Sequence, residues 1–180
     1  DTNGSFDIFF HDRLTGQTTR VSLSTDGAQG NWDSDDRPAI SADGRFVAFN
    51  SGASNLTSGD TNAAQDIFVH DRQTGQTRRV SVASDGTQGN KGCYWGLAIS
   101  ADGHFVTFAS EASNLVLNDT NDFDDIFVHD QQTGQTTRVS VASDGAQGNG
   151  RSQHAAISSD GRFVSFTSDA NNLVLNDTNN

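Results

Sequence analysis

One stretch of sequence occurs three times in this chain, at offsets of 59 or 58 residues, and begins a fourth time. Asp-Thr-Asn stands at residues 1–3, 60–62, 119–121 and 177–179. Units of this size do not bury a core alone, so neighbouring units must stack. We therefore expect one repeat array over residues 1–180, with units at 1–59, 60–118 and 119–176 and the start of a fourth at 177–180.

Each unit contains short β-branched and aromatic runs separated by Asp-Gly and Thr-Gly pairs, a pattern that predicts strands joined by tight turns. The predicted turns after the first and third strands are short, and those after the second and fourth are long. Alternate connections of an antiparallel sheet lie at the same end, so both long loops should share one face of the array. The strands predicted in the first complete cycle are 39–41, 45–50, 66–70 and 78–82.

The hairpin words are the most specific part of each unit. They are SADGRFVAF at 41–49, SADGHFVTF at 100–108 and SSDGRFVSF at 158–166. Together with the DIFVHD-type and TGQTTRVSV-type words, they resemble the repeat of TolB-like β-propellers of exported bacterial proteins. The resemblance covers the whole chain and implies four-stranded antiparallel blades set about an axis, although related propeller repeats are shorter, at about 40–45 residues.

The phase of the repeat predicts incomplete blades. Counting strands from Asp1 gives the third and fourth strands of one blade, two whole blades, and the first and second strands of another. This is fewer than the roughly four to eight blades that close a propeller. The arrangement could be a segment of a longer chain, two chains completing a ring, or an open array continuing as a filament. Unpaired half-blades favour self-association, because exposed strand edges recruit partners.

Composition limits the partners and the location of the chain. The formal net charge of −12 repels phosphate backbones and anionic lipid, so nucleic acid is not expected. No apolar stretch reaches the roughly 18 residues of a membrane span. A single cysteine, Cys93, forms no internal disulfide. We expect an extracellular or periplasmic bacterial protein, and the lack of methionine suggests an excerpt of a longer chain.

The loop before each third strand carries Asp at position 1, Asn at position 3 and Asp at position 7. Calcium prefers six to eight oxygen ligands, and alternating side chains of a tight loop can converge on one ion. The alternative is that Asp and Asn only make turns before the strand. Asp12, Asp71 and Asp130 recur at position 12, too far along the strand to join the ion, and are expected to cap the next turn. The predicted calcium ligands are Asp1, Asn3 and Asp7; Asp60, Asn62 and Asp66; Asp119, Asn121 and Asp125; and Asp177 with Asn179.

The copies differ most in the other long connection. Trp32, Tyr94 and Trp95 occur there and could stack on a sugar or anchor a protein partner. Alternatively, these aromatic side chains could fill the top of a blade.

The repetition argues against catalysis, because chemistry needs a unique constellation of groups. His11, His70 and His129 occupy one repeated position and are expected to be packed or turn-bonding residues. The sequence contains no Gly-x-Ser-x-Gly or His-Glu-x-x-His motif. We expect a non-catalytic, calcium-stabilised module with a structural, scaffold or self-assembling role. The alternative is a closed propeller that binds a protein or glycan through its variable loops.

Overall fold

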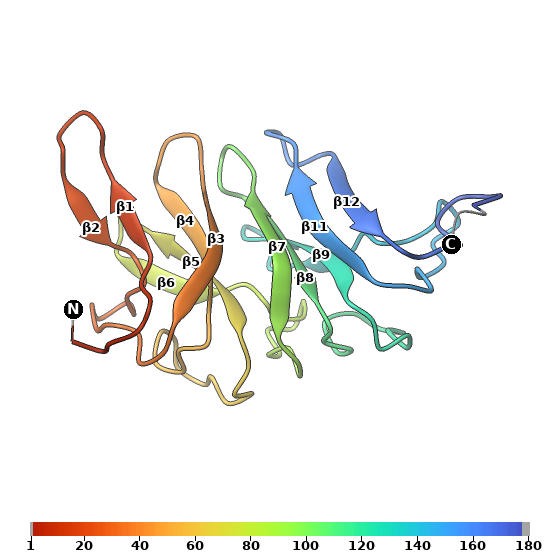
Figure 1. The fold of residues 1–180 in the computed structure, drawn as a ribbon, viewed down its shortest axis with the longest axis horizontal. Helices are drawn as coiled ribbons and strands as arrows, with labels where there is room; N and C mark the ends of the chain where they lie inside the picture. Colours follow the sequence, from red (N-terminus) through yellow and green to blue (C-terminus); the bar gives the residue numbers. More distant parts are fainter. Residues whose placement is uncertain (1, 178–180) are drawn as a thin grey trace.

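The computed structural model describes residues 2–177, except for the side chain of Asp36, and has an all-β fold (Figure 1). In this part of the chain no helix has the length and apolar character of a membrane span. The strands are β1 (Phe9–His11), β2 (Thr18–Arg20), β3 (Ser34–Ile40), β4 (Phe46–Ser51), β5 (Asp66–Asp71), β6 (Gln76–Arg79), β7 (Cys93–Ile99), β8 (Phe105–Ser110), β9 (Asp125–Asp130), β10 (Thr136–Arg138), β11 (Ser152–Ile157) and β12 (Val164–Ser168).

The strands form four antiparallel sheets, in the phase that the sequence predicts. An N-terminal half-blade, β1–β2, is followed by a first full blade in the order β3-β4-β5-β6. A second full blade, β7-β8-β9-β10, is followed by a C-terminal half-blade, β11–β12. Each full blade therefore takes its first two strands from one sequence repeat and its last two from the next.

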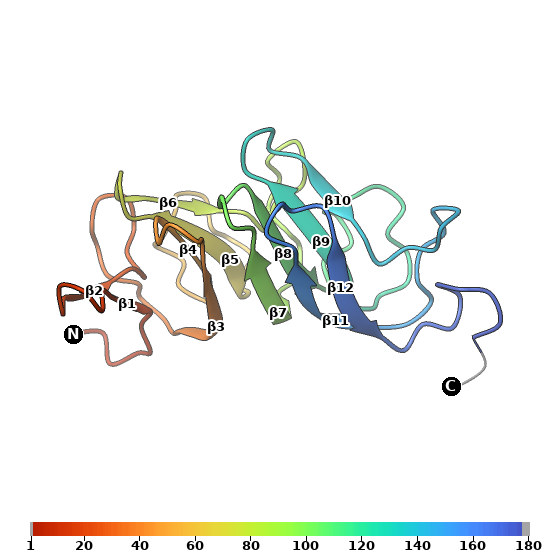
Figure 2. The ribbon, with the colours of Figure 1, turned by 90° about the horizontal axis from the view of Figure 1, so that it is seen from above.

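The four sheets follow one another along the long axis of the molecule, and the two termini lie at opposite ends (Figures 1 and 2). The first strands of neighbouring blades lie against each other, β3 against β7 and β7 against β11. This contact places the first strands on the inner side of the array, as in blades that radiate from an axis.

Three apolar clusters lie between the sheets and form the core. The side chains of β5 illustrate why: Ile67 and Val69 face the second full blade, whereas Phe68 faces the N-terminal half-blade. Phe68 stacks on Phe49 at a centroid distance of 5.9 Å, and Phe127 stacks on Phe108 in the same geometry. Burial of one such side chain contributes about 1.5–3 kcal/mol, so each blade is stabilised by its neighbours on both sides.

The short turns are held by their own polar side chains. In the β3–β4 turn, the Ser41 hydroxyl donates to Asp43 at 2.6 Å and accepts from the Phe46 amide at 2.9 Å. Asp71 caps the next turn by accepting from the Gln73 amide at 2.9 Å. Asp12 and Asp130 cap the equivalent turns, which confirms the role predicted for position 12.

Hydrogen bonds also link the long loops of neighbouring sheets. Asn31, after the N-terminal half-blade, and Asn55, after β4, are joined by a bond from the Asn31 amide to Asn55 Oδ1 at 2.9 Å. The amide of Asn90 bonds Asn114 in the same way at 2.9 Å. The two kinds of long loop thus share one face of the array, as the strand order predicts.

The first strands begin earlier than predicted, and the fourth strands are shorter. β3 begins at Ser34 instead of residue 39, and the equivalent strand β7 begins at Cys93. Tyr94 and Trp95 therefore lie on β7 and not in a loop. A register shift between Tyr94 and Leu97 places extra residues in this strand. Such a bulge breaks the two-residue alternation by which a strand is recognised. β6 spans Gln76–Arg79 instead of 78–82.

The glycines of the β7–β8 and β11–β12 turns let the preceding blade approach closely. A Cβ atom on Gly103 would lie 2.2 Å from the Phe46 ring, and one on Gly161 would lie 2.2 Å from the Phe105 ring. Both glycines have positive φ, 78° and 72°. Any other residue would therefore be strained and would also push the neighbouring blade away.

We predict that Gly103→Ala destabilises the chain more than Gly134→Ala. Both positions have positive φ, at 78° and 74°, but a Cβ atom at Gly134 meets nothing within 4 Å. The shared backbone strain should cost about 1 kcal/mol, and overpacking against Phe46 should add about 1–3 kcal/mol. Urea unfolding of the two variants measures the difference, and equal losses would contradict the packing role of Gly103.

Candidate functional site

The predicted metal-ligating carboxylates come together around an arginine that the sequence prediction missed. Arg79, at the end of β6, lies between Asp60 of the long loop and Asp66 at the start of β5. Its Nη1 atom is 3.4 Å from Asp60 Oδ1 and 3.4 Å from Asp66 Oδ2. In the next unit Arg138 lies 3.4 Å from Asp119 and 3.2 Å from Asp125. The guanidinium thus occupies the space between the two carboxylates.

Further polar groups complete this Asp–Arg cluster. The Ser81 hydroxyl donates to Asp66 Oδ1 at 2.5 Å, and Gln88 Nε2 donates to Asp60 Oδ1 at 3.1 Å. The Asn62 side chain bonds within its own loop, where Oδ1 accepts from the Ala64 amide at 3.0 Å. Its Nδ2 donates to Asp66 at 3.1 Å. The Asn of this loop therefore makes the turn that the alternative interpretation predicted.

The Asp–Arg cluster carries excess negative charge in a buried place. Asp66 is fully buried, and burial raises its pKa, with the charge of Asp60 acting in the same direction. The Ser81 hydroxyl and the Arg79 charge oppose this rise. Burial, followed by the charge of Asp125, likewise raises the pKa of Asp119. Two carboxylates against one guanidinium leave a formal charge of −1 in each cluster.

The other copies of the loop are only partly visible. Asp7 pairs with Arg20 at 3.3 Å and accepts from the Ser22 hydroxyl at 2.7 Å, and Asn3 donates to the Gly30 carbonyl at 2.8 Å. Asp1, the first predicted ligand of this loop, lies outside the described residues. Asn179, the predicted partner of Asp177, also lies outside them. Over residues 2–177, no three His, Cys, Asp or Glu side chains are grouped so that they could hold a metal ion. Calcium ligation stays a prediction.

The three aromatic residues predicted to bind a partner lie in two different places. Trp32 precedes β3, packs beside Gly52 and is 64% exposed. Tyr94 and Trp95 are 39% and 56% exposed and lie on the inner strand β7, where Trp95 has a φ of 47° within the bulge. Trp32 and the Tyr94–Trp95 pair thus lie on different elements of the fold.

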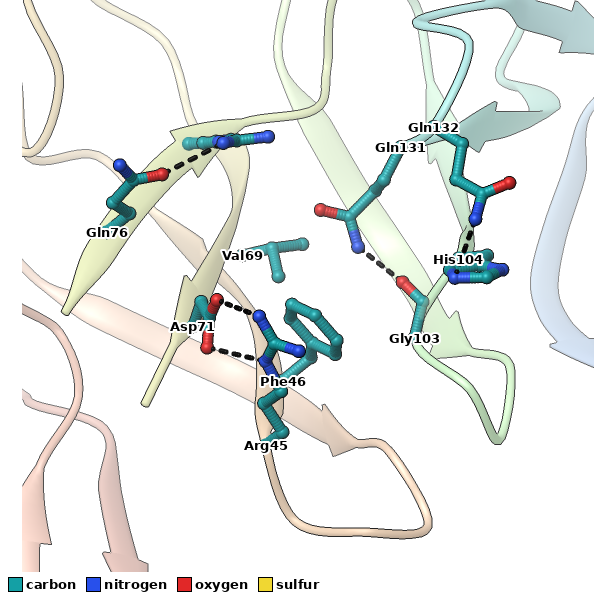
Figure 3. Close-up of a pocket in the computed structure, with 10 residues that line it drawn as sticks. Arg45, Phe46, Val69, Asp71, Gln76, Gly103, His104, Gln131 and Gln132 are labelled. Carbon is teal, nitrogen blue, oxygen red and sulfur yellow. Dashed lines mark hydrogen bonds and ion pairs between the residues drawn. The ribbon is translucent and has the colours of Figure 1, made fainter. Parts of the chain in front are cut away.

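A cavity of about 220 Å³ lies between the two full blades, on the side of the short turns (Figure 3). Arg45 makes two hydrogen bonds to Asp71 there, at 2.9 and 2.7 Å, and these bonds hold the pKa of Asp71 well below its usual range. On the opposite wall, Gln132 contacts the His104 ring at 3.0 Å, and Gln131 donates to the Gly103 carbonyl. His104 replaces the arginine of the other hairpin words, so this lining differs from that of the other joints between sheets.

The potentially reactive groups of the chain are held in structural contacts. The His70 ring contacts the Thr77 hydroxyl at 2.9 Å, but this buried hydroxyl donates to the Leu23 carbonyl and is not free to attack a substrate. His129 and Thr136 repeat the arrangement. Burial raises the pKa of Cys93 to about 12, so its thiol stays protonated at neutral pH. The packed histidines agree with the prediction from their repetition.

The two buried histidines should make the fold sensitive to acid. Burial lowers the pKa of both His70 and His129 below the ordinary value of 6.5. The unfolded chain then binds more protons than the folded chain, so stability is lost as the pH falls below about 6.5. Between pH 7 and 5 we expect the melting temperature to fall less in a His70→Gln, His129→Gln variant than in the wild type. An equal fall of the melting temperature in the variant and the wild type would show that groups other than His70 and His129 cause the sensitivity to acid.

We also predict a large cost for removing the central arginine. Arg79→Met leaves two buried carboxylates without their cation and should cost about 3–5 kcal/mol. Arg78→Met is the matched control, because Arg78 is exposed and bonds only Gln76 among the contacts resolved for it, at 2.8 Å; its loss should stay within about 0.5 kcal/mol. Chemical denaturation compares the two variants. Similar losses would contradict a central role of Arg79 in the cluster.

No protein-family profile and no curated protein sequence matches this chain. Solved structures do share its fold. TolB from Acinetobacter baumannii is 18% identical, with a TM-score of 0.51 over 89% of this chain and 31% of its own. A putative TolB from Agrobacterium tumefaciens is 20% identical, with a TM-score of 0.52 over 90% of this chain and 50% of its own. The tricorn protease is 12% identical, with a TM-score of 0.56 over 93% of this chain and 13% of its own.

The chain thus spans half or less of the length of each of these structures. Because both TolB structures and a protease contain such blades, the shared fold does not by itself separate a binding module from part of an enzyme. The similarity, together with the four-stranded blades and the hairpin words, shows that the chain has a TolB-like β-propeller fold.

Proposed function

We propose that this chain is a non-catalytic, propeller-type repeat module of an exported bacterial protein, with a structural and self-assembling role. The observation that carries the proposal is the use of the repeated residues. Residues present in every unit pack between blades, cap turns or join loops, as Phe68, Asp71 and Asn90 do. A repeated sequence that serves its own stacking is typical of scaffold arrays.

Composition supports an extracellular or periplasmic location. The chain has one cysteine, buried and unpaired, so its stability does not depend on the redox state of its surroundings. The net charge of −12 keeps such a module soluble and away from anionic lipid. Signal-peptide-dependent secretion of the natural protein, followed by cell fractionation, tests the location.

Calcium binding by the Asp-Thr-Asn loops is a further part of the proposal. The formal charge of −1 in each Asp–Arg cluster and the raised pKa of Asp66 favour an additional cation. However, calcium and the guanidinium compete for the same oxygens, because Arg79 Nη1 lies 3.4 Å from both Asp60 and Asp66. Calcium would therefore have to move Arg79 or use the carboxylate oxygens that Arg79 leaves free.

A chelator experiment tests calcium. If calcium holds the loops, EDTA lowers the melting temperature and added CaCl₂ restores it by mass action. Arg79→Met should then respond to calcium more strongly than the wild type, because the competing cation is gone. Arg78→Met should respond as the wild type does. A melting temperature unmoved by either reagent in all three proteins would contradict calcium ligation and leave Arg79 as the cation of the cluster.

The cavity between the full blades favours a second candidate function, that of a propeller binding a protein or glycan. Its walls carry His104 and Gln131, which stand where the preceding joint has Arg45 and Arg72, together with Gln132. Titration of the isotope-labelled chain with peptide and glycan libraries, followed by NMR, would show shifts at these residues if they bind a ligand. His104→Ala is the control that should abolish them.

Self-assembly is tested by the mass of the chain in solution. The scaffold proposal predicts that the mean mass measured by light scattering rises with protein concentration. The ligand-binding alternative predicts a constant mass. A monomer at every concentration would contradict the self-assembling role.

A further inference from the structure

The first joint, between the N-terminal half-blade and the first full blade, is filled on the side of the short turns. Arg72 of the full blade reaches across this joint, and its guanidinium lies 3.2 Å from the centre of the Phe10 ring of the half-blade. Its Nη1 atom also donates to the Gly44 carbonyl at 2.6 Å. A ring and the guanidinium stacked on it thus occupy the space between these two sheets.

The joint between the two full blades has shorter side chains at the same places. One repeat further along the chain, Phe10 corresponds to Val69 and Arg72 corresponds to Gln131. Gln131 keeps the bond to the hairpin turn, since its Nε2 atom donates to the Gly103 carbonyl. Because Gln131 has no guanidinium and Val69 has no ring, the cavity of about 220 Å³ lies where the first joint is filled.

A third exchange changes the charge of the cavity. Arg78 lines it, whereas the corresponding residue of the N-terminal half-blade is Thr19. Asp71, the one carboxylate among the described lining residues, accepts two hydrogen bonds from Arg45. With His104 counted as neutral, two guanidinium groups and one carboxylate give the lining a formal charge of +1, in a chain whose net charge is −12. The cavity therefore favours an anionic ligand over a cation.

Arg78 is the group that suits a carboxylate. It is exposed, and its Nη2 atom donates to the neutral Gln76 side chain at 2.8 Å. A guanidinium presents two parallel N–H groups that match the two oxygens of a carboxylate, and such charge-assisted bonds are stronger than a bond to a neutral amide. A carboxylate that enters the cavity can thus replace Gln76 as the partner of Arg78.

The rest of the lining suits a ligand that also carries hydroxyl groups. The low pKa of Asp71 keeps its carboxylate ionised and able to accept further hydrogen bonds. The side-chain oxygen of Gln131 is a second acceptor, and it points away from Gly103 (Figure 3). Val69 and the Phe46 ring supply an apolar wall. Hydroxyl groups fit the two acceptors, and the C–H groups that carry them fit the wall.

The size of the cavity limits the ligand to a small molecule. An apolar cavity of about 150 Å³ takes up benzene. By the same measure, the cavity of about 220 Å³ holds roughly ten non-hydrogen atoms, about the size of one sugar ring. Gln76, Arg78 and Gln132 on its walls are exposed, so the cavity opens to solvent and a ligand can enter without a change of fold.

We propose that the cavity between the two full blades binds a small hydroxylated carboxylate, with the chemistry of one acidic sugar residue, and that Arg78 holds its carboxylate. This inference rests on the second proposed function, ligand binding, and names the class of ligand. The hydroxyl groups of the ligand donate to Asp71 and to Gln131, and its apolar face lies against Val69 and Phe46.

Titration with matched ligands tests the class. Glucuronate differs from glucose by a carboxylate in place of a hydroxymethyl group, and acetate has the carboxylate without the hydroxyl groups. In NMR titrations of the isotope-labelled chain, glucuronate should shift the signals of Gln76, Gly103 and Gln131. Its dissociation constant should be about 1 mM, as expected for a ligand of this size. Glucose and acetate should each bind at least about tenfold more weakly.

A variant copied from the first joint should block the cavity. Gln131→Arg introduces the residue that fills the first joint as Arg72, so the variant should fold and melt no lower than the wild type. Glucuronate should nevertheless bind at least about tenfold more weakly, because the added guanidinium occupies its place. Gln17→Arg makes the same charge change at an exposed position outside the cavity and should leave the dissociation constant within about twofold. Stronger binding by Gln131→Arg, or equal effects of both variants, would overturn the cavity as the site.

A second variant tests the role of Arg78. Arg78→Thr introduces the residue that stands in the N-terminal half-blade as Thr19. It should weaken the binding of glucuronate at least about tenfold and leave that of glucose within about twofold, because only glucuronate brings a carboxylate. An equal loss for both sugars would overturn Arg78 as the partner of the carboxylate.

The results separate the class of ligand from ligand binding itself. Equal affinity for glucose and glucuronate, or shifts at the cavity caused only by peptides and neutral glycans, would overturn the acidic class and leave the binding function standing. A chain in which none of these molecules shifts the signals of Gln76, Gly103 and Gln131 contradicts both.

Discussion

Apolar packing between neighbouring sheets is the constraint on which the rest of this structure depends. A four-stranded sheet with one solvent-facing side needs only one partner, but the third strands here are apolar on both sides. Ile67 and Val69 belong to one cluster and Phe68 to another. No sheet of this kind is stable in isolation, so the smallest stable unit is a set of neighbours.

Polar groups fix the geometry that apolar packing leaves open. On the face of the long loops, the Asp–Arg clusters hold the loop between the second and third strands to its own sheet, and the Asn pairs join it to the loop that links neighbouring sheets. On the opposite face, hairpin turns of successive blades bond directly, Ala42 to Ala101 at 2.9 Å and Ala101 to Ser159 at 3.0 Å. Because hydrogen bonds are directional and apolar contacts are not, these two polar rows determine how the sheets are oriented.

Much of this fold could be predicted from sequence, because its signals are local and occur several times. Asp43-Gly44 and Thr74-Gly75 specify turns through their own backbone preferences. Repetition predicted packed or turn-bonding histidines, and His70 and His129 are buried, whereas His11 in the N-terminal half-blade is exposed and contacts Thr18. The start of β3 was missed because a bulge interrupts its alternation and Asp35 and Arg37 look like loop residues.

The charge partner of the Asp-Thr-Asn loop was missed for another reason. Arg79 follows Asp66 by 13 residues, in the TRV or RRV word that recurs as Arg20 and Arg138. Antiparallel pairing of β5 with β6 brings these residues together, so the contact depends on register and not on spacing within one loop. A repeated arginine opposite a repeated aspartate was the available signal. The Asp-Thr-Asn loop considered alone favours a metal ion as the partner of its carboxylates. The β5–β6 hairpin considered as a whole contains an arginine whose guanidinium is their partner.

The close approach of Phe46 to Gly103, and of Phe105 to Gly161, has a consequence for any larger assembly. In each joint the ring fills the space that a side chain at the glycine would occupy, so the distance between the two blades at this rim depends on the ring and the glycine together. Because the same pair of residue types closes both joints, each repeat carries the spacing of its own joint, however many blades an array of such repeats contains.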